Sequence, residues 1–543
     1  MIALRLDHVT FSHPGGLKLE NLSWALQAGQ KLGLVGPNGS GKSTVLQLLT
    51  GDLTPDDGFV IGAKGATVGY LPQEINFAKG QTILTEAMTA SSRIAEIDQA
   101  LQRVEASLAD PTVYNSETRL TEVLNQQADL LNQYEEAGGL KYENTVKATL
   151  RQLGFSKEEF GLSTSTLSGG QKKMLMLVKL VINRPSVLLL DEPDNHLDLA
   201  GKNRLEQFIH QYEGAVVIVS HDRYMLDEVA TGIVELAGGK FEFYTGSYSA
   251  YVTEKELRQL RQAQMYAAQQ KEIAQLEAAI ARFELWARLV VDERHIKQAR
   301  NKRRQIDRMD KVDKPTEQQS MRLRLNGWRG SDKVLEVTDL LKAFEENIVL
   351  AGLNLTLWHK ERVGLIGANG TGKSVFFRCV TGQEIPTDGI IKIGPSVKMG
   401  IYTQEHESLD YGKNLVETVR DIKSMYEHEA IAFLGKFQFP YQKALYQTVG
   451  SLSGGERSRL QMALLMLQEP NFLLLDEPTN NIDIQSAEVL EMALNEFNGT
   501  VLVISHDRYF LDKVVDKVVE LDPNQGDLVE YLGGYTDYLA EQS

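Results

Sequence analysis

The sequence predicts an α/β fold built from two duplicated modules, and three observations support this prediction. A glycine-rich segment that fits G-x-x-x-x-G-K-[ST] occurs twice, as GPNGSGKS at 36–43 and as GANGTGKS at 367–374. The tetrapeptide LSGG also occurs twice, beginning at Leu167 and at Leu452. His221 follows Leu167 by 54 residues, and His506 follows Leu452 by the same 54 residues. Because chance matches do not preserve spacing, the two halves are copies of one module.

Each copy alternates short apolar runs with helix-length segments, a pattern typical of a mostly parallel sheet covered by helices. The run KLGLV precedes the first glycine-rich loop and RVGLI precedes the second, so we expect a strand before each loop and a helix after it. The runs VLLLDEP and FLLLDEP, followed by VVIVSHDRY and VLVISHDRY, add strands at matching positions of the two copies.

Two helical hairpins are expected beside the repeated parts. Between its glycine-rich loop and its LSGG, the first module is 46 residues longer than the second, and apolar residues at three- and four-residue steps there predict a hairpin arm at about residues 90–140. This arm either projects from the module or packs on it. Residues 248–330, rich in charge, Gln and Ala, predict a longer hairpin that turns between Trp286 and Asp292. The expected domains are a first module at 1–247, a helical linker at 248–330 and a second module at 331–543.

Composition indicates where the protein works. The net charge is −16, so the surface as a whole does not attract polyanions. A single cysteine, Cys379, excludes an internal disulfide and fits a reducing compartment. The longest apolar runs have the length of strands, and no signal-peptide pattern opens the chain. We expect a soluble cytoplasmic protein with no membrane segment and no disulfide-linked partner.

One segment of the linker reverses the overall charge. Six basic residues and no acidic residue lie between positions 294 and 304, which predicts binding to nucleic-acid phosphates. A solvated helix face is the alternative interpretation. The residues expected to contact RNA are Arg294, Lys297, Arg300, Lys302, Arg303 and Arg304.

The glycine-rich loops carry the residue types that bind nucleotide phosphates. Their glycines let backbone N–H groups face the phosphates. Lys42 and Lys373 are placed to reach the β- and γ-phosphates, and the hydroxyls of Ser43 and Ser374 are placed to ligate Mg²⁺. The sequence therefore predicts two phosphate-binding loops.

Two carboxylates follow each LLL run. Asp191 and Asp476 are expected to hold Mg²⁺ through its water shell. Glu192 and Glu477 come next in the chain and are expected to orient or deprotonate the attacking water. The matched position of both pairs argues against ordinary solvated strand ends.

An amide and an imidazole complete each set. Gln73 and Gln404 lie 37 residues beyond the first glycine of their own loops, where a neutral amide can touch both Mg²⁺ and the water. His221 and His506 follow buried-strand patterns and are expected to hydrogen-bond the γ-phosphate.

Taken in order, the phosphate loop, glutamine, LSGG signature, DEP and SHD motifs resemble those of ATP-binding-cassette ATPases. The whole chain is similar to their ABC-F branch, which has two cassettes, no membrane segment and a charged helical linker. The resemblance implies two P-loop NTPase cassettes in a head-to-tail sandwich within one chain, which we expect to be monomeric. It also implies an ATP hydrolase with ATP and Mg²⁺ at two composite sites, each between the phosphate loop of one module and the signature of the other.

The family pattern transfers to this sequence residue by residue. Site one would comprise the loop residues Gly36, Asn38, Gly39, Ser40, Gly41, Lys42, Ser43 and Thr44, with Gln73, Asp191, Glu192 and His221, against Ser453, Gly454, Gly455 and Asp483. Site two would comprise Gly367, Asn369, Gly370, Thr371, Gly372, Lys373, Ser374 and Val375, with Gln404, Asp476, Glu477 and His506, against Ser168, Gly169, Gly170 and Asp198.

A few positions depart from the family pattern. Asp194 stands where DEPTNHLD has threonine, and Asn481 stands where the first module has a histidine. The adenine-stacking aromatic is expected to be Phe344 in the second module, whereas the first module offers His13 with Phe11 nearby. No catalytic group is lost, and asymmetry between the two sites is expected.

Members of this branch act on the ribosome, so the resemblance implies binding at the tRNA exit site, with the linker contacting rRNA and tRNA near the peptidyl-transfer centre. ATP turnover would regulate or rescue translation, and protection against a ribosome-bound antibiotic is one form of that role. Trp286 and the apolar residues 289–291 stand at the expected tip, where they would press on RNA or pack the hairpin together.

The alternative is an ATPase subunit of a transporter with separately encoded membrane domains, which would not need a basic linker. A DNA-repair ATPase is disfavoured because the chain lacks a far longer coiled coil and zinc-binding cysteines.

Overall fold

The computed structural model describes residues 2–12, 18–78, 80–108, 117–136, 138–290, 293–309, 323, 325, 327–345, 347–403, 409–480, 482–521 and 528–542. The chain divides into two compact units. One unit consists of Met1–Phe243 together with Ser320–Ser543 and holds both duplicated modules, while the other consists of Tyr244–Gln319.

A six-stranded sheet forms the centre of the first module, in the order β5-β6-β7-β3-β8-β9. Neighbours from β5 to β8 run parallel. Every residue of β6 and β7 is buried, because parallel strands covered on both faces read as continuous apolar runs. The bounds are β3 (Lys31–Val35), β5 (Val68–Leu71), β6 (Val187–Asp191), β7 (Ala215–Val219), β8 (Gly232–Ala237) and β9 (Lys240–Thr245).

The second module repeats this sheet strand for strand, in the order β14-β15-β16-β12-β17-β18. The neighbours from β14 to β17 are parallel, and β18 pairs antiparallel with β17. The bounds are β12 (Arg362–Ile366), β14 (Met399–Tyr402), β15 (Phe472–Asp476), β16 (Thr500–Ile504), β17 (Lys517–Leu521) and β18 (Leu528–Leu532).

A three-stranded antiparallel sheet covers one side of each module, in the orders β2-β1-β4 and β11-β10-β13. In the first module the core joins this sheet, helix α1 and the parallel sheet through fully buried side chains such as Leu6, Val45 and Leu34. The bounds are β1 (Ile2–Ser12), β2 (Lys18–Gln27), β4 (Asp57–Gly62), β10 (Lys333–Phe344), β11 (Asn347–Trp358), β13 (Asp388–Ile393), α1 (Lys42–Thr50) and α12 (Lys373–Thr381).

Among the described residues, five of the remaining helices follow the same order in both modules, and the second module has two more. In the first module they are α2 (Ile83–Met88), α6 (Gly139–Gln152), α7 (Gly169–Ile182), α8 (Leu199–Gln211) and α9 (Arg223–Val229), with short 3-10 turns at Glu158–Gly161 and Thr164–Thr166. In the second they are α13 (Leu415–Ile422), α14 (Glu427–Gly435), α15 (Tyr441–Tyr446), α16 (Gly454–Gln468), α17 (Ile484–Glu496), α18 (Arg508–Val514) and α19 (Tyr535–Gln542), with a turn at Val449–Ser451.

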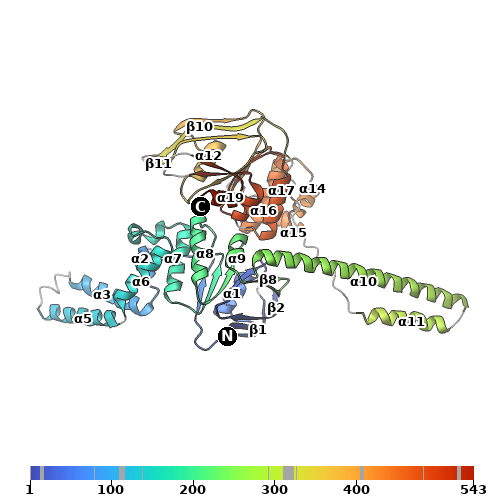
Figure 1. The fold of residues 1–543 in the computed structure, drawn as a ribbon, viewed down its shortest axis with the longest axis horizontal. Helices are drawn as coiled ribbons and strands as arrows, with labels where there is room; N and C mark the ends of the chain where they lie inside the picture. The colour runs from blue at the N-terminus through green and yellow to red at the C-terminus, as the bar shows by residue number, and fades with distance from the viewer. Residues whose placement is uncertain are drawn as a thin grey trace. The chain divides into compact units, whose positions relative to one another are not determined.

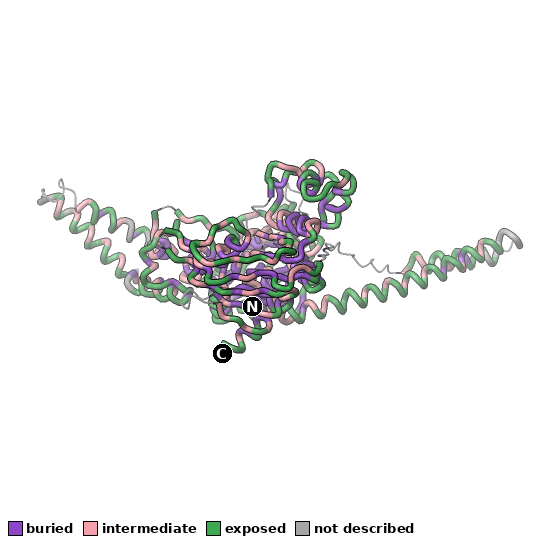
Figure 2. Tube along the Cα trace, turned by 90° about the horizontal axis from the view of Figure 1, so that it is seen from above, coloured by how far each residue is buried: buried purple, intermediate pink, exposed green. Residues whose placement is uncertain are grey.

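The expected arm of the first module is a helical hairpin of α3 (Ser92–Leu108) and α5 (Glu117–Glu136). Figure 1 shows the two helices lying side by side and extending from the module, so the arm projects rather than packing flat on it. Leu124 and Leu131 on α5 are nearly half exposed, and much of this arm has the colour of exposed residues in Figure 2. The expected break at 110–111 lies outside the described residues.

The linker unit contains α10 (Tyr248–Val290) and α11 (Glu293–Asp307), which pack against each other. Leu276 and Ile280 of α10 and Ala299 of α11 are buried, so the paired parts of the helices form the apolar seam. Leu257 and Leu260 continue that helical face in sequence but are exposed at 47% and 56%, because a helix stripe becomes core only where a second element covers it. The expected α/β fold with a helical linker and an inserted arm is confirmed.

Candidate functional site

Both phosphate loops lie between a parallel strand and a helix, as the sequence predicts. The first joins β3 to α1 and the second joins β12 to α12. The Lys42 ammonium donates to the carbonyl oxygens of Gly36 and Pro37 at 2.8 and 3.1 Å, and Lys373 does the same at its own loop. Burial lowers the pKa of both lysines, although nearby carboxylates oppose this effect. Each loop therefore curls around its own ammonium group.

The first glycine of each loop has no room for a side chain. A Cβ on Gly36 would lie 2.4 Å from the carbonyl oxygen of Leu236, and one on Gly367 would lie 2.8 Å from that of Leu521. Both glycines also have positive φ, at 155° and 150°. The sequence motif thus reflects a close approach of each loop to the neighbouring strand of its sheet.

The two aspartates lie at the carboxyl ends of β6 and β15. Asp191 is 1% exposed and accepts hydrogen bonds from the hydroxyls of Ser43 and Tyr70, the latter at 3.3 Å. Burial raises the pKa of Asp191, and burial likewise raises that of Asp476 beside Ser374. Among the described residues, the Oδ1 atom of Asp191 is buried without a hydrogen-bond partner. A buried carboxylate oxygen next to a serine hydroxyl fits the oxygen ligands that Mg²⁺ prefers.

The two glutamates that follow share a strained backbone conformation. Glu192 has φ 48° and Glu477 has φ 47°, and their amides donate to the carbonyls of Val219 and Ile504. Such left-handed residues are uncommon without glycine and gather at functional sites. Burial, with the charge of Asp476, raises the pKa of Glu477 to about 8, and burial raises that of Glu192.

The glutamate side chains are held differently at the two sites. Glu192 Oε2 accepts from the amides of Gln73 at 2.7 Å and Asn195 at 2.6 Å. Glu477 Oε2 accepts from the backbone N–H of His506 at 3.3 Å. Gln404, the predicted counterpart of Gln73, lies outside the described residues.

The two histidines stand beside these glutamates. His221 Nε2 lies 3.9 Å from Glu192 Oε1, and His506 Nε2 lies 3.6 Å from Glu477 Oε1. Burial, with the charges of nearby lysines, lowers the pKa of each imidazole to about 3, so both are neutral at physiological pH. Both ring nitrogens of His221 are buried without a hydrogen-bond partner in the described part of the chain. A neutral imidazole there can donate one hydrogen bond to an incoming oxygen.

The signature serines begin helices α7 and α16. Ser168 accepts from the backbone N–H of Gln171 at 3.2 Å and Ser453 from that of Glu456 at 3.4 Å, in two matching capping boxes. Accepting this bond leaves each hydroxyl hydrogen available as a donor. Gly170 and Gly455 follow within the first turn, where free backbone N–H groups favour anions.

Reciprocal hydrogen bonds join the loops to the opposite module. The Asn38 N–H donates to Asp483 Oδ2 at 3.4 Å, and the Asn369 N–H donates to Asp198 Oδ2 at 3.2 Å. The Asn369 side chain adds a bond to the carbonyl of His196 at 3.1 Å. Both predicted aspartates therefore reach the loop of the other module.

A cavity of about 760 Å³ lies at site two. Residues of the second loop and its strand ends line it together with the signature of the first module, which agrees with the head-to-tail pairing that the family resemblance implies. The lining includes Lys373, Ser374, Val375, Asp476, Glu477 and His506 from the second module, and Ser168, Gly169 and His196 from the first.

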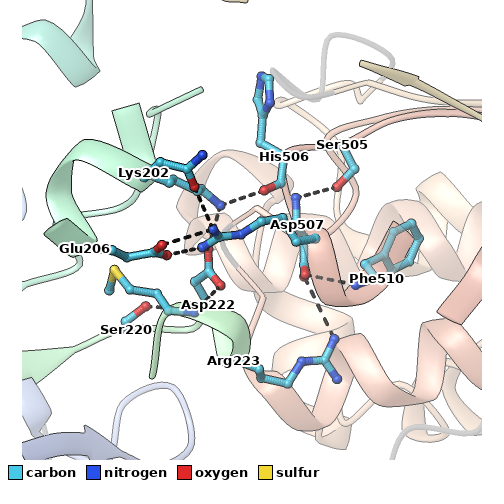
Figure 3. A network of polar contacts seen from close by, with 12 residues as sticks. Lys202, Glu206, Ser220, Asp222, Arg223, Ser505, His506, Asp507 and Phe510 are labelled. Atoms are coloured by element: carbon cyan, nitrogen blue, oxygen red, sulfur yellow. Dashed lines mark hydrogen bonds and ion pairs between the residues drawn. The ribbon is translucent and has the colours of Figure 1, made fainter. Parts of the chain in front are cut away.

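Sequence reasoning missed a buried ionic network at the contact between the modules (Figure 3). Arg223 is paired with Glu491, and Arg508 is paired with Glu206, each across the two modules and each almost fully buried. The two pairs are related by the repeat, since both arginines belong to an SHDRY motif. That shared register was the signal that could have revealed them. Lys202 pairs with Asp222, whose Oδ2 atom also lies 3.7 Å from the Arg508 guanidinium.

The aromatic candidates for adenine stacking differ between modules. Phe344, at the end of β10, is 42% exposed, and the Lys342 ammonium lies 4.6 Å from its ring centroid. Phe11 is 8% exposed and belongs to the core of the first module, so its ring is not available for stacking. His13 lies outside the described residues.

The basic cluster lies on α11, within the linker unit. Five of its six side chains are exposed, while Lys302 is half-buried and donates to Gln305 at 3.3 Å. Arg303 forms an ion pair of 2.9 Å with Glu284 of α10. At the expected tip, the ring of Trp286 is 5.9 Å from that of Phe283, and the side chains of 289–291 lie outside the described residues.

Comparisons with known proteins show which family this architecture resembles. A family model described as ABC transporter matches residues 19–195 and 350–480, and a second model with the same description matches 234–325. The chain is 33% identical to ABC transporter F family member 5 of Arabidopsis thaliana, over 99% of this chain and 77% of that protein. It is 35% identical to the energy-dependent translational throttle protein EttA of Haemophilus influenzae, over 96% of this chain and 92% of that protein.

Among solved structures, the chain resembles the archaeal ribosome recycling factor aABCE1, crystallised with an archaeal ribosomal stalk protein. The TM-score is 0.58 at 18% identity, over 98% of this chain and 92% of that one, which is a likeness of fold. In the part of the chain that the structure describes, no helix is both long and apolar enough to cross a membrane.

Proposed function

The chain belongs to the ABC-F family of ATP-binding-cassette ATPases, and on this premise we propose that it binds the ribosome and uses two composite Mg-ATP sites to regulate or rescue translation. The observation that carries this proposal is the exposed basic face of α11 in the linker of an otherwise acidic chain. One relative, EttA, is named as a translational throttle protein, and one structural neighbour, aABCE1, is named as a ribosome recycling factor. Both names agree with this role. Its expected location is the cytoplasm.

At each site the loop lysine would exchange its own loop carbonyls for phosphate oxygens. Lys42 and Lys373 already lie inside their loops, so this exchange needs a local movement of the ammonium group alone. The loop glycines let the backbone N–H groups bind the remaining phosphate oxygens. Together they would fix the γ-phosphate for attack.

Metal binding falls to the serine and aspartate of each site. Ser43 with Asp191, and Ser374 with Asp476, would hold Mg²⁺, and the unpartnered Oδ1 of Asp191 fits this role. When bound, Mg²⁺ would neutralise charge that develops on the phosphates. Gln73 would contact the Mg²⁺ of site one and, by resemblance, Gln404 would contact that of site two.

Water activation falls to Glu192 and Glu477. Each carboxylate lies at the end of a buried strand, next to a neutral histidine that can donate to the γ-phosphate. The positive φ of both glutamates departs from the extended conformation of the strand that precedes them. Glu192 and Glu477 would then orient the water and accept its proton.

ATP would also hold the two modules together. Asn38 and Asn369 hydrogen-bond the aspartates of the opposite module, and the signature serines would add contacts to the γ-phosphate. Loss of that phosphate would remove these contacts and release the sandwich. ATP binding would therefore keep the protein on the ribosome, and hydrolysis would release it.

The linker would supply the RNA contacts. The exposed basic side chains of α11 would meet phosphates, and a polyanion would compete with Glu284 for Arg303. Each phosphate neutralised lowers the log of affinity by about 0.7–0.9 per log unit of salt. We also propose, by resemblance, that the linker reaches tRNA near the peptidyl-transfer centre.

Sedimentation with ribosomes tests the proposal. A quadruple variant, Arg300→Gln, Lys302→Gln, Arg303→Gln and Arg304→Gln, should bind ribosomes more weakly and with a flatter salt dependence, while its ribosome-free ATPase stays at the parental rate. A matched control removes four charges from α10 by Arg258→Gln, Arg261→Gln, Lys271→Gln and Arg282→Gln. Equal ribosome binding by the parent and the α11 variant across a salt series would reduce the cluster to a solvated helix face and favour a transporter subunit.

Translation in a purified system separates the finer roles. A general translation factor should change peptide synthesis without any drug, whereas an antibiotic-protection protein should act only when a drug occupies the peptidyl-transfer centre. The Glu192→Gln, Glu477→Gln variant should inhibit in both cases, because it would remain trapped on the ribosome.

A further inference from the structure

The network between the modules contains one charge that the repeat does not explain. Residues that correspond in the two modules after the signatures are 285 positions apart, and by this rule Arg223 matches Arg508 and Glu206 matches Glu491. Lys202, however, matches Ala487. The lysine is therefore specific to the first module.

Lys202 is one of the most enclosed cations of the described structure. Its side chain is 8% exposed, and its ammonium donates to Asp222 Oδ2 at 2.8 Å and to the backbone carbonyl of His506 at 2.8 Å. The first contact stays inside the first module, whereas the second crosses to the second module (Figure 3). Although burial opposes it, the charges of Asp222 and Asp194 raise the pKa of Lys202, so the group is a cation.

A second buried charge accompanies the lysine. Asp194 is 5% exposed and interacts with the charge of Lys202, and its counterpart in the second module is Thr479. A buried charge without a partner costs several kcal/mol, so an acid and a base that are found together in one module compensate each other. Asp194 and Lys202 are thus an acid and a base that occur together in the first module and have uncharged counterparts in the second.

The contact to His506 acts on a residue of site two. The N–H of His506 donates to Glu477 Oε2, while the carbonyl of the same residue accepts from Lys202. The peptide backbone around His506 is thereby held at both ends, by the water-orienting carboxylate of its own site and by a cation from the opposite module. The second module has Ala487 at the position that matches Lys202, and a methyl group cannot donate such a bond to the equivalent carbonyl of site one, that of His221.

We propose that Lys202 is a positioning residue that acts across the interface: it fixes the His506 backbone, and through it Glu477, so that site two depends on closure of the sandwich more strongly than site one. The proposal rests on the roles assigned above to Glu192 and Glu477. It concerns a residue of the first module that serves the chemistry of the second, and it makes the two sites unequal although their ligand sets are alike.

Two variants separate the contact from the charge. Lys202→Met removes the ammonium group with its ion pair to Asp222, and of the two lysines whose charges act on Asp194 it leaves Lys173 alone. The double variant Asp194→Thr, Lys202→Ala removes both charges and installs the pair that the second module already accommodates as Thr479 and Ala487. Folding of the double variant is followed by its melting temperature, which should stay near that of the parent.

Turnover is measured for each site alone. Glu192→Gln leaves site two as the working site, and Glu477→Gln leaves site one. Both Lys202 variants should lower kcat at site two about tenfold and change site one less than about twofold, because a hydrogen bond to a charged group is lost at one site only. If the double variant recovers turnover at site two, charge compensation is the whole role of Lys202 and the proposal is wrong. Equal losses at both sites would also overturn it.

Amide hydrogen exchange gives a readout without turnover. In the parent, a non-hydrolysable ATP analogue with Mg²⁺ should protect residues 501–510 more than the matching residues 216–225, and in the double variant the two segments should be protected alike. Equal protection of the two segments in the parent would contradict the proposal. Should the Glu192→Gln, Glu477→Gln protein still hydrolyse ATP at the parental rate, the roles of the glutamates fail, and hydrogen exchange alone then decides the role of Lys202.

Discussion

The two nucleotide sites have nearly the same backbone and different buried charges. Glu192 and Glu477 share a left-handed φ within one degree, and both loop lysines close on the same loop carbonyls. In the first module, however, Lys173, Asp194 and Lys202 occupy positions that Ser458, Thr479 and Ala487 occupy in the second module. All three of the charged residues are buried.

This comparison shows which features duplication preserves. Strand ends and helix starts fix the ligand positions, and a change there would move every ligand of a site at once. Charges in the interior can diverge, provided that an acid and a base appear together, because a single unpaired charge would be costly. Lys173 illustrates the point: its ammonium donates to the carbonyl of Glu192. Burial lowers the pKa of Lys173, and the charges of Asp194, Glu192 and Asp191 oppose this effect.

The largest expected effect concerns what the sites share. Replacing both water-orienting carboxylates by Glu192→Gln and Glu477→Gln should lower ATP turnover by about a thousandfold, since a general base is lost while both loop lysines remain. Phosphate release measures turnover, and retention of labelled ATP on a filter measures binding. A control pair, Glu105→Gln with Glu427→Gln, removes the same charge from exposed helix positions. Parental turnover in the first variant would refute the assignment of the glutamates.

The next largest effect is expected when one of the two buried arginine–glutamate pairs between the modules is removed, and the two pairs are expected to differ. Arg223→Ala and Arg508→Ala should each weaken closure by about 3–5 kcal/mol, because each leaves a buried glutamate unpaired. Arg223→Ala should be the more damaging, since Lys202 remains as a cation beside Asp222 near the Arg508 pair. The rise in melting temperature on adding an ATP analogue reports closure. A larger loss in Arg508→Ala would show that Lys202 does not balance that end of the network.

A smaller effect tests the composite pairing at both sites. Ser453→Arg should reduce nucleotide retention at the Lys42 loop, and Ser168→Arg should reduce it at the Lys373 loop, each by about 2–3 kcal/mol because an arginine overfills the contact. Photo-crosslinking of an azido-ATP, mapped by mass spectrometry, distinguishes the two loops. If each variant instead loses nucleotide at the loop of its own module, the head-to-tail arrangement is wrong.

The smallest effect separates the two aromatic candidates. Phe344→Ala should raise KM for ATP at site two about fivefold, because an exposed ring that can stack on the base is removed. Phe11→Ala should leave KM unchanged and lower the melting temperature, because Phe11 packs in the core. Unchanged KM in Phe344→Ala would mean that the base does not stack on that ring.

The sequence predicted the repeat, the strand before each loop and the helix after it, because glycine, serine and apolar residues act there through local backbone geometry. It also predicted two helical hairpins, the arm from three- and four-residue apolar steps and the linker from its charged, Gln- and Ala-rich composition. It did not predict that Leu257 and Leu260 would be exposed while Leu276 and Ile280 are buried, since periodicity identifies a stripe but not the length of its covering partner.

What the sequence determined by itself is the set of chemical groups, since motif order and spacing name each loop lysine, aspartate, glutamate and histidine. Only the tertiary structure decided how these groups meet across the chain. From the sequence, Asp194 was a minor departure from the family motif and Lys202 was an ordinary helix residue. The partner of a charged side chain can be identified only when long-range packing brings the two residues together. The Lys202 contact to His506 joins residues 304 positions apart, a separation over which no local pattern carries information.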